Sequence, residues 1–77
     1  MSSLPTVSGA KMVAVLRRIG YEVARQKGSH VRMRHPSEPA RRPTTVPLHK
    51  ELKTGTLLAI LRDASLTRDE FKGLLDE

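Results

Sequence analysis

A chain of 77 residues without cysteine cannot form disulfide bonds or thiolate zinc sites, and none of its apolar stretches approaches the roughly 20 residues that cross a bilayer. Fourteen lysine and arginine residues against eight acidic ones give a net charge of +6. This charge favours a polyanionic partner, nucleic acid first and an anionic membrane second.

The positive charge is unevenly distributed along the chain. Residues 1–49 carry nine basic and two acidic side chains, a net charge of +7, whereas residues 50–77 carry five basic and six acidic ones, a net charge of −1. A concentration of positive charge in one part of the chain is typical of proteins that bind a polyanion. The alternative interpretation is an arginine-rich, solvated surface without a ligand.

The length predicts a single domain spanning residues 1–77 with a modest core. Tyr21 and Phe71 are the only aromatic residues, so this core must consist mainly of aliphatic side chains. Residues 1–6 show no basic segment followed by an apolar run, so we expect no secretory signal. The expected location is the cytoplasm, without membrane association.

The first element expected is an amphipathic helix over residues 9–19. Its apolar residues recur at spacings of three and four, which marks one buried helix face: Met12, Val13, Leu16 and Ile19. Ser8 can cap the free amide groups at the start of this helix, and Gly20 can adopt the left-handed conformation that ends it.

Two strands joined by a turn at residues 27–29 are expected next. In residues 21–26, alternation places Tyr21 and Val23 on one face and Glu22, Ala24 and Gln26 on the other. In residues 30–35, alternation directs Val31 and Met33 toward the core. The opposite, exposed face of this second strand would carry His30, Arg32 and Arg34.

The rest of the chain is expected to add a loop, a third strand and two helices. Residues 36–43 predict a mobile, turn-rich loop, and residues 44–49 a strand with Val46 and Leu48 inward and Thr45, Pro47 and His49 outward. Pro47 cannot donate to a neighbouring strand, so it indicates an edge or a strand end. A helix from about Thr54 would bury Leu57, Leu58, Ile60 and Leu61.

The last helix has the best marked start. Residues 67–70 form a capping box, and Leu66 and Phe71 occupy the positions of a hydrophobic staple. The resulting order, α-β-β-β-α-α, predicts an α+β fold. We expect a three-stranded antiparallel sheet with helices on one face and basic side chains on the open face.

The three histidines are the candidates for chemistry. His30 and His35 are five residues apart in one expected strand, so they face opposite sides and cannot chelate one metal ion together. His49 can approach His30 across the sheet, but no third ligand has a suitable spacing. We therefore predict no metal site and no cofactor.

Acid–base catalysis on RNA needs only a titrating imidazole beside cations that hold the phosphate. His30 can take the proton of a ribose 2′-hydroxyl or give one to the departing 5′-oxygen, and Arg32 and Arg34 share its face. Three further residues are candidates for RNA contacts: Lys27, Ser29 and Lys53. The plainer interpretations are a surface histidine in a basic strand, a turn serine that caps local backbone, and an ordinary helix start at Lys53.

Four segments together resemble the HicA family of toxins, the YcfA-like mRNA interferases of bacterial type II toxin–antitoxin systems. These segments are residues 15–21 (VLRRIGY), 26–30 (QKGSH), 45–49 (TVPLH) and 52–61 (LKTGTLLAIL). The resemblance implies a double-stranded-RNA-binding-domain-like fold. It also implies ribosome-independent cleavage of mRNA, inhibition by a HicB-type antitoxin, and a catalytic histidine after Gly-Ser, which is His30 here. His49 matches a recurrent family position whose role stays open.

The sequence therefore predicts a metal-independent endoribonuclease toxin with His30 as its catalytic residue. The alternative is a non-catalytic module that binds double-stranded RNA, which the expected fold and charge support equally well. A third possibility is a structural domain whose basic face docks an acidic protein.

Overall fold

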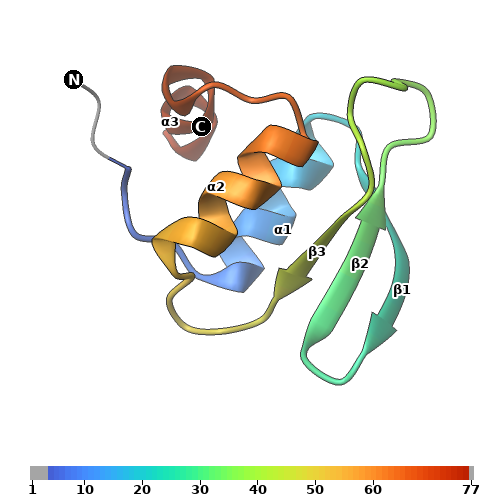
Figure 1. Cartoon of the computed structure of the whole chain (residues 1–77), viewed down its shortest axis with the longest axis horizontal. Helices are drawn as coiled ribbons and strands as arrows, with labels where there is room; N and C mark the ends of the chain where they lie inside the picture. Colours follow the sequence, from blue (N-terminus) through green and yellow to red (C-terminus); the bar gives the residue numbers. More distant parts are fainter. Residues whose placement is uncertain (1–3, 77) are drawn as a thin grey trace.

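The helices and strands follow one another in the order that the sequence predicts (Figure 1). The computed structural model describes residues 4–76. Its elements are α1 (Gly9–Arg18), β1 (Glu22–Lys27), β2 (His30–Arg34), β3 (Thr44–Pro47), α2 (Thr54–Asp63) and α3 (Arg68–Leu75). The α+β class and the α-β-β-β-α-α order are confirmed. β2 and β3 are shorter than the predicted strands by one and two residues at their C-terminal ends.

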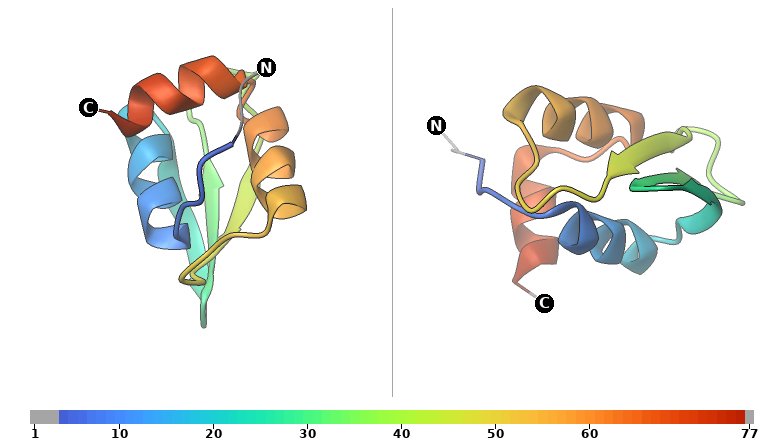
Figure 2. Two further views of the ribbon diagram at one scale, coloured as in Figure 1. Left: turned by 90° about the vertical axis from the view of Figure 1, so that its left-hand side faces the viewer. Right: turned by 90° about the horizontal axis from the view of Figure 1, so that it is seen from below.

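The three strands form an antiparallel sheet in the order β1-β2-β3, so β2 is central and the two others are edges. Figure 2 shows α1 and α2 side by side over one face of this sheet, with α3 across one end of both helices. Side chains from both layers form a single hydrophobic core that includes Met12, Leu16, Val31, Met33, Val46, Ile60 and Phe71. We call the uncovered side of the sheet the outer face. It carries Glu22, Arg25, Lys27, His30, Arg32, Arg34, Thr45 and Pro47.

The start of α1 fixes the helical layer to the end of the sheet. The hydroxyl of Ser8 accepts a hydrogen bond from the amide of Lys11 at 3.0 Å, as expected of an N-cap. The amide of Gly9 donates to the carbonyl of His49 at 2.9 Å. Gly20 has φ +102°, which confirms the predicted left-handed residue after the helix.

Gly9 lies so close to the backbone after β3 that no side chain fits. A Cβ there would overlap the carbonyl oxygen of Pro47 and lie 2.8 Å from the Cα of Leu48. We expect Gly9→Ala to lower the free energy of unfolding by roughly 1–3 kcal/mol, because backbone atoms on both sides must move. Gly73→Ala is the control, since a Cβ meets nothing within 4 Å there. It should stabilise α3 by about 0.5–1 kcal/mol.

Urea denaturation of the two alanine variants and the wild type measures this difference. Equal stability of Gly9→Ala and the wild type would show that the helix start can retreat from β3 at no cost.

β1 does not follow the simple alternation that the sequence suggests. Val23 pairs with Met33 and Arg25 with Arg32, so the register shifts by one residue between them and Ala24 is the extra residue of a β-bulge. Gln26 pairs with the buried Val31 and therefore shares the inner side with Val23, which corrects the predicted grouping of Gln26 with Glu22. The bulge keeps Tyr21 buried while the next basic residues turn outward.

Two predicted core residues are exposed. Leu48 is 38% exposed, because β3 ends at Pro47 and the chain leaves the sheet there. Leu58 is 36% exposed, because the buried stripe of α2 consists of Leu57, Ile60 and Leu61. The predictions for Leu48 and Leu58 are therefore wrong, whereas those for Val46 and the other three α2 residues are confirmed.

Hydrogen bonds anchor the second half of the loop between β2 and β3. The backbone amide of Arg42 donates to the carbonyl of Asp63 at 2.7 Å, and the Arg41 guanidinium donates to that of Ala64 at 3.1 Å. Burial raises the pKa of the Tyr21 hydroxyl, which donates to the carbonyl of Arg42 at 2.7 Å. The loop is turn-rich as predicted, but these contacts tie it to the end of α2 instead of leaving it free.

The start of α3 is the predicted capping box. The hydroxyl of Thr67 accepts from the amide of Glu70, and the Glu70 carboxylate accepts from the amide of Thr67 at 2.8 Å. This backbone hydrogen bond, together with that from the Thr67 side chain, holds the pKa of Glu70 below its ordinary range. The cap directs α3 across the core, where Phe71 is fully buried.

Candidate active site

His30 stands at the start of the central strand, directly after a two-residue turn. Gly28 occupies the first position of this turn with φ +58°, a conformation that glycine adopts readily. The Cα partners of His30 are Lys27 on β1 and Pro47 on β3. In the described part of the chain, no hydrogen bond or ion pair engages the exposed imidazole. The ring is thus free to contact a ligand.

Lys27 lies beside His30. Residues directly opposite each other on neighbouring strands place their side chains on the same face. Since Lys27 and His30 are such a pair, the structure brings the predicted lysine and the predicted histidine together on the outer face. Both side chains are exposed to solvent.

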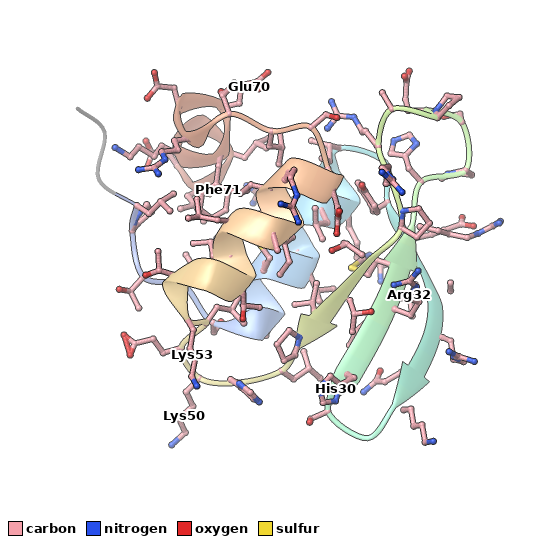
Figure 3. The ribbon with its side chains drawn as sticks, in the orientation of Figure 1. His30, Arg32, Lys50, Lys53, Glu70 and Phe71 are labelled. Carbon is pink, nitrogen blue, oxygen red and sulfur yellow. The ribbon has the colours of Figure 1, made fainter. Side chains whose placement is uncertain are left out.

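Arg32 follows His30 on the same face of β2 (Figure 3). Its guanidinium donates to the hydroxyl of Thr45 on β3 at 3.0 Å, and this contact holds the arginine over the sheet. One hydroxyl uses only one of the five donor groups of a guanidinium, so Arg32 keeps donors for a phosphate.

Arg34 shares the outer face but is already paired. Its Nε and Nη2 donate to Oε1 of Glu22 at 3.1 and 3.0 Å. Both side chains are more than half exposed, so this ion pair contributes little stability, on the order of 0–1 kcal/mol. Its main consequence is electrostatic. The negative charge of Glu22 offsets the positive charge of Arg34, which the sequence predicted to be available for a phosphate.

Ser29 contributes to the position of His30 through its backbone. Its carbonyl oxygen accepts a hydrogen bond from the amide of Leu48 at 2.6 Å, which ties the turn to the segment after β3. That segment in turn holds the start of α1 through the carbonyl of His49 and the amide of Gly9. Two backbone hydrogen bonds therefore connect the turn to the helical layer.

Lys53 belongs to a different element. It is the N-cap residue of α2, it makes no side-chain cap, and the first turn of this helix contains no acidic residue. Figure 3 shows Lys50 and Lys53 on the segment between β3 and α2, at the same end of the molecule as His30. The predicted lysine thus adds positive charge near this end without belonging to the sheet.

The other two histidines have different surroundings. Nε2 of His35 lies 2.7 Å from the carbonyl of Ile19, and its Nδ1 accepts from the amides of Ser37 and Glu38. Its ring also contacts Tyr21 edge-on, so His35 is a structural residue that holds the loop after β2. His49 is exposed beyond the end of β3.

Arg25 is the functional candidate that the sequence analysis missed. It pairs directly with Arg32 and therefore joins the outer face. A signal for it exists in the sequence: uninterrupted alternation from Val23 would point Arg25 and Lys27 toward the core, where unpaired charges are very costly. An extra residue in the strand resolves this conflict, and Ala24 supplies it.

The site is an open, cationic surface of exposed side chains. Two open surface hollows flank α3, and neither is lined by His30 or its neighbours. Among residues 4–76, no three histidine, aspartate or glutamate side chains converge as a metal site would require. No helix in this part of the chain is long and apolar enough to cross a membrane. An exposed imidazole among cations is suited to proton transfer beside a bound phosphate.

Comparison with known protein families identifies a match over most of the chain. The family described as HicA toxin of bacterial toxin-antitoxin matches residues 9–66, which include the whole sheet, α1 and α2. No curated protein matches the chain.

Proposed function

The chain belongs to the HicA toxin family of toxin–antitoxin systems, and on this basis we propose that it is a metal-independent endoribonuclease that cleaves mRNA in the cytoplasm. The observation that carries the proposal is the position of His30. Its exposed imidazole stands on the outer face beside Lys27 and two residues before Arg32. These are the groups that phosphodiester cleavage by acid–base catalysis needs.

The proposed reaction uses the 2′-hydroxyl of the substrate itself. A base takes the proton of this hydroxyl, its oxygen attacks the adjacent phosphorus, and the bond from phosphorus to the 5′-oxygen breaks. The departing oxygen receives a proton from an acid. One fragment then ends in a 2′,3′-cyclic phosphate and the other begins with a 5′-hydroxyl. The step consumes no water and needs no metal ion. His30 performs one of the two proton transfers.

The cations beside His30 have a separate task. Negative charge builds on the phosphate oxygens as the 2′-oxygen attacks, and preorganised donors stabilise that charge. Lys27 lies opposite His30, which supports it as the cation that binds the reacting phosphate, and the contact of Arg32 with Thr45 supports this arginine as a further phosphate ligand on β2. Arg34 has a weaker claim, because its guanidinium is bound to Glu22.

The proposed partner of this toxin is a HicB-type antitoxin. Membership of a toxin–antitoxin family supports the existence of an antitoxin partner. The exposed, positively charged outer face is a surface that an inhibitor of complementary charge can cover. The protein encoded beside this one is expected to bind it and to suppress its cleavage of RNA.

Cleavage of single-stranded RNA in the presence of EDTA tests the proposed function. The purified protein should release fragments with 2′,3′-cyclic phosphate ends, and its expression without the antitoxin should arrest growth. Tight binding of double-stranded RNA with no cleavage of any RNA would instead support a non-catalytic binding module.

A further inference from the structure

Two cross-strand pairs form parallel rungs on the outer face. Lys27 lies opposite His30, and Arg25 lies opposite Arg32. The rungs are two residues apart along β2, a separation of roughly 6.6–6.8 Å. Consecutive phosphates of an extended RNA strand are separated by a similar distance, so each rung can meet one phosphate.

The next rung differs in charge. Glu22 lies opposite Arg34, and the two side chains form the ion pair at 3.0 Å. A carboxylate at this position repels a third phosphate and occupies the arginine that would bind it. The row of positive side chains on the outer face therefore consists of two rungs and ends next to the bulge at Ala24.

Bases have little to bind on this surface. Sheets that read single-stranded RNA stack bases on exposed aromatic rings. The two aromatic residues of the chain, Tyr21 and Phe71, are both buried in the core. The outer face can therefore hold RNA through its phosphates, and it offers no tyrosine, phenylalanine or tryptophan ring to the bases.

We propose that the outer face binds two consecutive phosphates of one extended RNA strand. Lys27 and His30 take the phosphate that is cleaved, and Arg25 and Arg32 take its neighbour along β2. This inference rests on the proposed ribonuclease function and adds Arg25 as a positioning residue. The proposed substrate is single-stranded, because the phosphate spacing of an extended strand matches the separation of the two rungs.

Binding of a single-stranded RNA 12-mer to the His30→Ala variant, with and without Arg25→Ala, tests the second rung. Fluorescence anisotropy should show a loss of affinity of roughly tenfold at low salt. The slope of log Kd against log salt should fall by about 0.7, the value for one lost phosphate contact on a single strand. Arg17→Ala is the matched control, because Arg17 is an exposed arginine on α1. It should leave both quantities unchanged.

Cleavage kinetics give a readout that a structural role would not change. In a chain with an active His30, Arg25→Ala should lower kcat/KM for a 12-mer and leave it unchanged for a dinucleotide, which has only one phosphate. Arg25 is exposed and has no partner side chain in the described residues, so circular dichroism should show an intact fold.

The outcomes separate the two proposals. Equal affinity and salt slope for Arg25→Ala and Arg17→Ala would overturn the second rung, even if the wild type cleaves RNA. If the wild type cuts no RNA but Arg25→Ala still lowers the affinity for RNA, the second rung stands and the proposed ribonuclease function is refuted. Equal affinity for duplex and single-stranded RNA would overturn the assignment of a single-stranded substrate. A protein that binds its antitoxin but no RNA would overturn the proposal that the outer face binds phosphates.

Discussion

Replacing His30 with alanine is expected to slow RNA cleavage by about 10²- to 10⁴-fold, because a positioned imidazole that transfers a proton in the transition state contributes an acceleration of this order. The fold should survive, since the side chain is exposed and holds no other residue in place. Single-turnover cleavage of a labelled RNA in EDTA, with a thermal unfolding curve for each protein, measures both effects.

Two further variants make the result specific to proton transfer. His30→Gln keeps hydrogen-bonding groups but cannot titrate near neutral pH, so it should be about as slow as His30→Ala. Arg17→Ala changes an exposed residue on the helical layer and should cleave at the rate of the wild type. Undiminished cleavage by His30→Ala would refute the assignment of this histidine.

The largest expected effect on stability comes from Phe71→Ala. The ring is fully buried, and truncating a buried phenylalanine costs about 3–5 kcal/mol through lost contacts and the cavity that remains. Stability of small domains lies near the lower end of about 5–15 kcal/mol, so the variant should keep roughly 0–2 kcal/mol and be measurably unfolded at room temperature. Urea denaturation followed by circular dichroism measures the change.

Leu58→Ala is the matched control for the phenylalanine. Leu58 is a hydrophobic residue of α2 that is 36% exposed, so its truncation should cost only about 1–2 kcal/mol. A loss for Phe71→Ala as small as that for Leu58→Ala would show that α3 is dispensable. The point matters because α3 lies outside residues 9–66, the part that the family match covers.

Local chemistry made much of the fold predictable. Ser8, Gly20 and the capping box at residues 67–70 mark the ends of helices through hydrogen bonds within a few residues, and all three predictions are confirmed. Alternation in β2 correctly placed His30 and Arg32 on the exposed face, because a regular central strand has one side toward the helices.

The misplaced residues depend on contacts that are distant in the sequence. Ala24 becomes a bulge only because Tyr21 must reach the core while the hairpin turn fixes the register of Lys27 and His30. Leu58 belongs to an apolar run in which every leucine is an equal candidate for burial until the neighbouring helix is known. The pairing of Arg34 with Glu22 likewise needed the register of the two strands.

The hydrogen bonds that join Ser29 to Leu48 and His49 to Gly9 involve main-chain atoms only. The path of the chain around residue 30 is therefore independent of which side chain occupies that position. Under the proposed function, a His30→Ala variant keeps this backbone and loses its toxicity. Such a variant is then the form of the protein to produce in cells as bait for the proposed antitoxin.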